Sequence, residues 1–293
     1  MKYKLPIAFF IVITIWTTTP LAIKWSSDGV SFTFALMSRM IIGVICAYIL
    51  LRFLGMTLPW NKTVRRTYLA ASFNIYFAMM LIYWASQFIP SGWVAVIFGL
   101  APMITGIIAY KVLSEDALTP AKIFGSCIAL IGLSIIFLTG EEATSLSVYA
   151  MSAVLLSTII HSVCTVWVKQ LDAVVSPLAT TTGALLYAVP AFILSWLIFD
   201  GTVPENIPVR AALSIVYLGV IGSVIGFALY YYVLKQIEAS RVALITLITP
   251  VTALLLGNWL NNESLTLRIG LGAFLILSGL FCYELLGRKR SKI

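Results

Sequence analysis

Three polar side chains lie inside long apolar stretches of this 293-residue chain, where each could do chemistry. Arg39 carries a permanent charge on a planar fork of donors that suits a carboxylate. His161 could bind a ligand or carry a proton, because imidazole titrates near neutral pH. Asn74 lies among aromatic residues and offers both donors and an acceptor. Together these residue types predict a binding site for a small polar molecule in an apolar interior.

Each of the three residues also has a purely structural interpretation. Arg39 could extend its long stem to the nearest polar interface. His161 could be a packed core residue beside Ser162, and Asn74 could make an interhelical hydrogen bond. Arg39 lies about eight positions into its apolar segment. An unpaired guanidinium within a span costs about 2.5 to 3.5 kcal/mol on insertion scales, which favours an anionic ligand or a structural ion pair for Arg39.

The aromatic residues divide by depth within the apolar segments. Those near segment ends are typical of a membrane-interface belt, namely Trp60, Trp93, Tyr110, Trp167 and Trp259. Those nearer mid-depth could form a stacking surface for a ligand. With the polar candidates, the residues predicted to line a substrate cavity are Trp16, Thr17, Arg39, Asn74, Phe77, Phe98, His161, Tyr187 and Phe227.

Three prolines interrupt apolar segments. Pro102 and Pro250 are predicted at mid-helix, where each removes a backbone hydrogen bond, and Pro20 follows three threonines. A freed carbonyl in a membrane must be satisfied by protein or water, so these positions predict helices that bend or line a cavity. Simple kinks are the alternative. Gly222 and Gly226, four residues apart, are expected to form a helix-packing face.

The segments that carry these residues are those of an all-α integral membrane protein. The chain is 61% hydrophobic and 10% charged, a composition that a soluble domain of this length could not place on a solvated surface. Ten stretches are long and apolar enough to span a bilayer. We predict helices at 4–23, 32–54, 67–86, 91–112, 120–139, 147–168, 177–199, 210–234, 240–260 and 266–286.

Basic residues set the expected orientation, because Lys and Arg stay on the cytoplasmic side. With both termini in the cytoplasm, 15 of the 19 basic residues lie on that side, and only Lys24, Arg210 and Arg268 lie on the other. The net charge of +8 is spread over these short loops, so we expect no nucleic-acid partner.

The second half of the sequence repeats the first. At an offset of 148 the matched residues are Tyr83 with Tyr231, Val94-Ala95 with Val242-Ala243, Pro102 with Pro250 and Glu115 with Glu263. At an offset of 147 the matched residues are Gly125 with Gly272 and Gly132 with Gly279. At an offset of 145 they are Lys24 with Lys169 and Ser31 with Ser176. A unit of five spans must enter the membrane in opposite orientation the second time. We therefore predict two inverted five-helix repeats, residues 1–143 and 144–293, an architecture typical of alternating-access transporters.

The absences narrow the function further. All eleven acidic residues fall in loops or near segment ends, so no carboxylate is expected at mid-membrane to carry protons or hold sodium. The four cysteines lack metal-ligand spacing, and no enzyme motif is present. We expect no metal, cofactor or catalytic residue. An intramembrane enzyme acting on lipid is a remote alternative.

The sequence resembles the drug/metabolite transporter superfamily, specifically the EamA-like family of ten-helix bacterial permeases. The residues that carry the resemblance, several of them in both halves, are Trp16 with Lys24, Arg39, Ala95 to Pro102 with Ala243 to Pro250, and Glu115, Gly125, Gly132 with Glu263, Gly272, Gly279. Thr17 departs from the pattern, since many members have Gly there. The resemblance implies a substrate cavity between the halves and, most often, export of amino acids or other small metabolites.

These observations predict a secondary transporter of a small organic metabolite in the inner membrane of a bacterium, acting as a monomer. Arg39 and the aromatic residues favour a zwitterionic or anionic solute, with amino acids as the leading class. Efflux of cationic amphiphiles is the alternative, which the lack of a buried acid disfavours. Because no buried acidic residue is expected to carry protons, we also favour facilitated or weakly proton-coupled transport.

The orientation can be tested by labelling. Cysteines introduced at Glu142 and Asn262 should react with an impermeant thiol reagent added outside the cell, and one at Lys62 should not, because the basic loops remain inside. The reverse pattern would overturn the orientation.

Overall fold

The computed structural model describes residues 4–114, 119–138, 145–242 and 245–287, and every regular element in these ranges is helical. The first half contains α1 (Lys4–Ser26), α2 (Phe32–Phe53), α3 (Lys62–Phe73), a π-helical turn at Asn74–Ala78, α4 (Met79–Ala85), α5 (Ser91–Phe98), α6 (Ala101–Leu113) and α7 (Pro120–Leu138). The second contains α8 (Ser145–Leu171), α9 (Pro177–Phe199), α10 (Val209–Tyr217), a π-helical turn at Leu218–Gly226, α11 (Phe227–Gln236), α12 (Ala239–Val242), α13 (Ile245–Asn261) and α14 (Leu267–Gly287).

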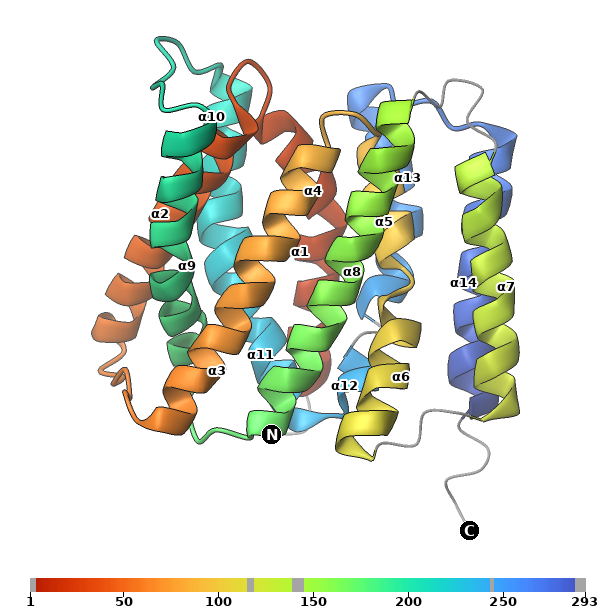
Figure 1. The fold of residues 1–293 in the computed structure, drawn as a ribbon, viewed down its shortest axis with the longest axis horizontal. Coiled ribbons are helices and arrows are strands. Elements are labelled where there is room, and N and C mark those ends of the chain that lie inside the picture. Colours follow the sequence, from red (N-terminus) through yellow and green to blue (C-terminus); the bar gives the residue numbers. More distant parts are fainter. Residues whose placement is uncertain (1–3, 115–118, 139–144, 243–244, 288–293) are drawn as a thin grey trace.

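These elements form ten spans that cross the molecule from one face to the other, which confirms the all-helical membrane fold (Figure 1). Seven segments of the described chain are long and apolar enough by themselves to cross a bilayer. The third span begins at Lys62, earlier than predicted, because the Asn61 side chain accepts a hydrogen bond from the Val64 amide and caps the helix there. The fourth span is broken between α5 and α6.

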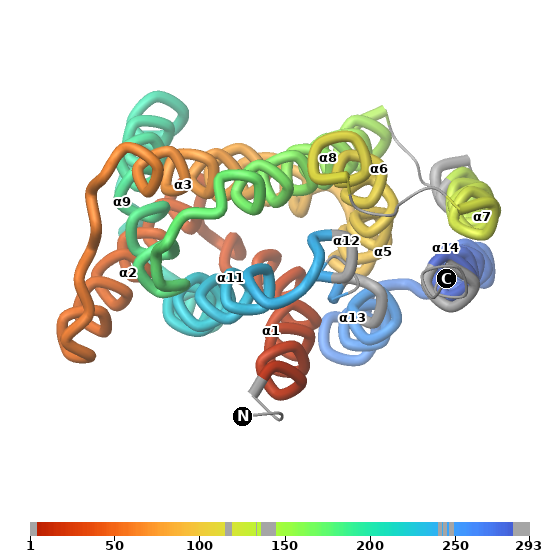
Figure 2. The backbone as a smooth tube through the Cα atoms, turned by 90° about the horizontal axis from the view of Figure 1, so that it is seen from below, coloured from red at the N-terminus to blue at the C-terminus, as the bar shows by residue number. Residues whose placement is uncertain are grey.

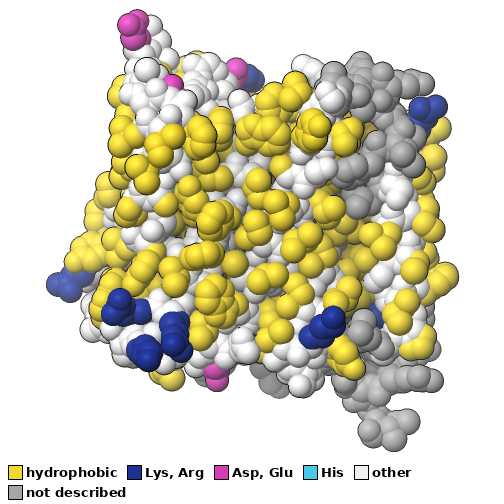
Figure 3. All heavy atoms as spheres, viewed as in Figure 1, with side chains coloured by type: hydrophobic (Ala, Val, Ile, Leu, Met, Phe, Trp, Pro, Cys, Tyr) yellow, Lys and Arg dark blue, Asp and Glu magenta, His cyan; other side chains and the backbone are white. Residues whose placement is uncertain are grey.

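The two ends of the described chain, at Lys4 and Gly287, lie on one side of the molecule, which we call the terminal face (Figure 1). Apolar side chains cover the middle of the visible surface, and most of the visible Lys and Arg side chains gather near the terminal face (Figure 3). Phe53, Phe199 and Leu267 are among the large apolar residues left exposed. A lipid environment accounts for such a surface.

The two halves run in opposite directions. α1 leaves the terminal face, whereas its counterpart α8 returns to it (Figure 1). The second span of each half starts with the same cap: Ser31 accepts from the Phe34 amide, and Ser176 accepts from the Ala179 amide. The duplication therefore reproduces local backbone chemistry as well as hydropathy.

The fifth spans of the halves, α7 and α14, pack against each other at one side of the bundle (Figure 2). The glycines of the repeated motif make this contact possible. A Cβ atom at Gly132 would lie 2.5 Å from the Gly272 carbonyl oxygen, and one at Gly279 would lie 2.7 Å from the Ala129 amide. Only residues without a side chain allow two helix backbones to approach this closely.

Gly279→Ala should lower the melting temperature of the detergent-solubilised protein, because its methyl group would meet backbone atoms that cannot move independently, at a cost of about 1 to 3 kcal/mol. Gly270→Ala in the same helix is the matched control: a Cβ atom there meets nothing within 4 Å. Equal melting temperatures for the two variants would contradict the close packing.

Candidate functional site

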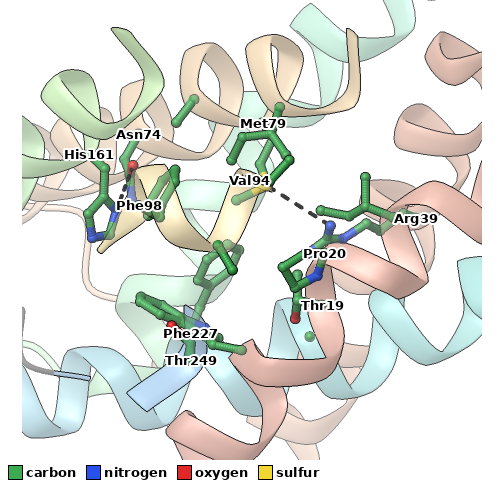
Figure 4. Close-up of a pocket in the computed structure, with 16 residues that line it drawn as sticks. Thr19, Pro20, Arg39, Asn74, Met79, Val94, Phe98, His161, Phe227 and Thr249 are labelled. Atoms are coloured by element: carbon green, nitrogen blue, oxygen red, sulfur yellow. Dashed lines mark hydrogen bonds between the residues drawn. The ribbon is translucent and has the colours of Figure 1, made fainter. Parts of the chain in front are cut away.

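A cavity lies among spans of both halves, with about 710 Å³ of empty space that is partly open to solvent (Figure 4). It reaches from mid-span toward the face opposite the termini. Its walls come from α1, α2, the two π-helical turns, α4, α5, α8, α11 and α13. The lining residues are Trp16, Thr19, Pro20, Ile23, Arg39, Asn74, Ala78, Met79, Ile82, Val94, Ala95, Phe98, His161, Gly222, Phe227 and Thr249.

The structure brings together most of the residues that the sequence singled out, although they are far apart along the chain. Six of the nine cavity candidates line this one space, and so does one of the three prolines. They are Trp16, Arg39, Asn74, Phe98, His161 and Phe227, with Pro20. None of the lining residues is acidic.

Arg39 points from α2 into the cavity and is only 1% exposed (Figure 4). Its Nε atom donates to Ser223 Oγ at 3.0 Å, and its Nη1 atom donates to Tyr83 OH at 3.3 Å. Its Nη2 atom has no hydrogen-bond partner in the described part of the chain and faces Gly222. Ser223 and Tyr83 thus hold the guanidinium through Nε and Nη1, and the N–H groups of Nη2 can still donate hydrogen bonds.

Two acidic residues near the start of α2, Asp28 and Asp200, are engaged with other groups. Asp28 pairs with Arg210 at the face opposite the termini. Asp200 accepts hydrogen bonds from Ser31 and Thr202, and the Ser31 bond is the main cause that holds the pKa of this carboxyl below its usual value. Within the described ranges no carboxylate forms an ion pair with Arg39. Among the described residues, none neutralises the positive charge in the cavity.

His161 and Asn74 form a second polar group in the same cavity. Nδ1 of His161 lies 3.2 Å from Oδ1 of Asn74, a distance that fits an N–H donated to the amide oxygen. The imidazole also packs edge-on against Trp16, with ring centroids 5.8 Å apart, and against Phe98 at 5.6 Å. The interhelical hydrogen bond considered for Asn74 is thus made to His161, and His161 also has the packing contacts considered for it.

Three residues that we expected in the cavity wall lie outside it. The Thr17 hydroxyl is 3.0 Å from that of Thr252, so it links α1 to α13. Phe77 lies on the outer side of the first π-helical turn and is 44% exposed. Tyr187 stacks on Trp60 near the terminal face, with centroids 5.8 Å apart. Hydropathy gives the depth of a residue but not the side of the helix on which it lies.

The prolines also differ from one another. Pro102 lies in the first turn of α6, after the break at Gly99 and Leu100, and not at mid-helix as we expected. A first-turn proline removes no helical hydrogen bond. Pro20 and Pro250 do lie inside helices. Near Pro20 the Thr18 and Thr19 hydroxyls donate to the Ile15 carbonyl, so they serve the backbone.

The two π-helical turns occupy equivalent places in the two halves, and sequence reasoning missed both. At the offset of 148, Asn74 of the first turn matches Gly222 of the second, and both line the cavity. π-Helical turns are frequent at functional sites because they redirect side chains. Gly222 was expected to pack between helices, but it leaves space beside Arg39 Nη2, which a Cβ atom would approach to 3.4 Å. Sequence reasoning also missed Tyr83 as a hydrogen-bond partner of Arg39, although its match with Tyr231 in the second half could have drawn attention to it.

Comparison with known proteins agrees with this architecture. The chain matches the EamA-like transporter family twice, over residues 4–138 and 148–284. The chain belongs to the EamA-like transporter family. It is therefore a multi-pass secondary transporter of the drug/metabolite transporter superfamily and not an enzyme.

Two relatives of this EamA-like transporter align over nearly its whole length. An "Uncharacterized transporter" of Archaeoglobus fulgidus is 28% identical over 282 residues, 94% of this chain and 96% of that protein. A protein of Streptantibioticus cattleyicolor named "Probable terminal-alkyne amino-acid exporter" is 26% identical and covers 97% of this chain and 95% of its own. A crystal structure with 19% identity has a TM-score of 0.74, covering 96% of this chain and 98% of its own, and so has the same fold.

In this EamA-like transporter, Pro250→Ala should slow turnover and leave substrate affinity within a few-fold, because it restores an amide donor and stiffens α13. Pro102→Ala should change the rate less, since a first-turn proline breaks no helical bond. Counterflow rates in proteoliposomes measure both. Equal slowing by the two variants would contradict this prediction, because the position of each proline within its helix would then not matter.

Proposed function

We propose that this transporter exports small metabolites bearing a carboxylate, with amino acids as the leading class, by alternating access of the central cavity. The unneutralised Arg39 guanidinium is the observation that carries this proposal. It is buried, it is positioned by Ser223 and Tyr83, and its Nη2 donor has no partner among the described residues beside the space that Gly222 leaves. A substrate carboxylate there would supply the missing counter-charge and accept the remaining donors.

The rest of the cavity suits the other parts of such a substrate. Trp16, Phe98 and Phe227 offer aromatic surface for an apolar side chain. The Asn74 and His161 pair, on the opposite wall from Arg39 in Figure 4, offers polar atoms for an amino or other polar group. The absence of an acidic residue among the lining residues disfavours a cationic amphiphile as substrate.

Export from the cytoplasm rests on two further arguments. The basic residues favour a cytoplasmic terminal face, in the inner membrane if the source is a bacterium. The Streptantibioticus relative is named as an amino-acid exporter, and it aligns over nearly the whole chain. We propose that one chain suffices, because the cavity is built by the two halves of a single molecule.

Arg39 variants test the substrate class. Arg39→Lys should weaken binding of a carboxylate substrate about tenfold or more, because a point charge replaces the planar donor fork. Arg39→Ala should abolish transport. Counterflow in proteoliposomes against amino acids, nucleosides and quaternary ammonium dyes identifies the substrate and measures both effects.

Arg52→Ala is the matched control, since it removes the same side chain from the exposed end of the same helix. It should transport at the parent rate. Folded Arg39→Ala protein, verified by its melting temperature, that still transports a carboxylate substrate at the parent rate would overturn the proposal.

A further inference from the structure

The terminal ends of α8 and α11 are joined by lysines that donate to main-chain carbonyls. Lys169, near the end of α8, donates to the Leu234 carbonyl at 3.3 Å and to the Ile237 carbonyl. In the reverse direction Lys235, near the end of α11, donates to the Ala173 carbonyl at 3.0 Å and to that of Val175. Each lysine thus satisfies carbonyls that the end of the other helix, or the loop after it, leaves without helical partners.

The opposite face carries a related contact. Lys24, near the end of α1, donates to the Ile89 carbonyl at 3.2 Å, and its Nζ atom lies 3.9 Å from Glu263 Oε1. Glu263 in turn accepts from the Ser91 amide at 3.0 Å and from the Gly92 amide, at the start of α5. Lys24 therefore ties α1 to the connection between the third and fourth spans.

The two contacts are equivalent under the internal repeat. Lys24 matches Lys169 at the offset of 145, and Ile89 matches Ile237 at the offset of 148. The same ammonium-to-carbonyl bond therefore occurs twice, once at each face of an inverted duplication. In an alternating-access protein, contacts that exchange under the repeat are the ones expected to open in turn.

Both contacts lie beside internal cavities. Ile23, beside Lys24, lines the central cavity. On the terminal side a second cavity has about 440 Å³ of empty space, partly open to solvent, and its lining residues include Lys169, Asp172, Leu234 and Lys235. Between the two cavities Trp16 stacks on Tyr230 with centroids 5.1 Å apart, and the Tyr230 hydroxyl lies 2.6 Å from that of Thr165.

We infer that Lys24 and Lys169 are a symmetry-related pair of latches that hold the two ends of the transport path closed. Lys235 reinforces the latch at the terminal face. In this structure both latches are made, so opening either end must break the lysine contacts there and let water take over the carbonyls. The inference rests on the alternating access in the proposed function, but not on the identity of the substrate.

Cys164 provides a native reporter for the terminal latch. It lies on α8 between His161 and Lys169, next to Thr165, and is 5% exposed. In protein with Cys46, Cys127 and Cys282 replaced by Ser, the experiment measures the rate at which a charged methanethiosulfonate reagent modifies Cys164 from the terminal side. Lys169→Met keeps the stem, removes the ammonium and should raise this rate about tenfold.

The opposite latch gives an effect of opposite sign. Lys24→Met should favour opening of the other face and lower the rate at Cys164 from the terminal side several-fold, as a shift between two states requires. Lys111→Met, which removes an exposed lysine at the end of α6, should leave the rate unchanged. If Lys169→Met fails to fold, Lys235→Met tests the same latch.

Rates in the Lys169→Met or Lys235→Met protein equal to those of the Lys111→Met control would overturn the inference. An increased rate in Lys24→Met would also overturn it, because loss of stability would then explain labelling better than exchange of states. The substrate assignment fails separately, in the Arg39 transport assay, because Cys164 labelling needs no substrate.

Discussion

Within a bilayer every polar group must find its partner inside the protein, and most features of this structure satisfy that requirement. Serine caps begin both second spans, and the hydroxyls of Thr18 and Thr19 serve a backbone carbonyl near Pro20. Lysines near the helix ends donate to carbonyls of other spans and loops. Arg39 differs from these groups because its Nη2 donor, which has no hydrogen-bond partner among the described residues, faces the cavity beside Gly222.

The duplication supplies the same backbone twice, and divergence of side chains makes the site. π-Helical turns occur in the third span of each half, but one presents Asn74 and the other Gly222. Likewise Trp16 and His161 occupy matched positions on α1 and α8 and contact each other. A symmetric framework can expose a cavity to either face in turn, whereas an asymmetric lining can orient one solute.

The interhelical contacts differ in how readily they can break. α7 and α14 pack backbone against backbone through glycines, and such an interface loses its close dispersion contacts if the helices separate. The lysine contacts at the two faces join ammonium groups to carbonyls, and water can replace each partner. We therefore expect the paired fifth spans to stay together during transport and the lysine-linked ends to move.

The sequence by itself determined the membrane class, the ten spans, the duplication and the family resemblance, because hydropathy, basic residues and repeated motifs are linear properties of the chain. It also identified Arg39, His161 and Asn74, since a polar residue within a span is costly wherever it points. Only the tertiary structure decided that Phe77 and Tyr187 face away from the cavity, that Pro102 starts a helix, and that Ser223 and Tyr83 hold Arg39. These outcomes depend on helix rotation and on contacts between distant spans, which the order of residues along one helix does not specify.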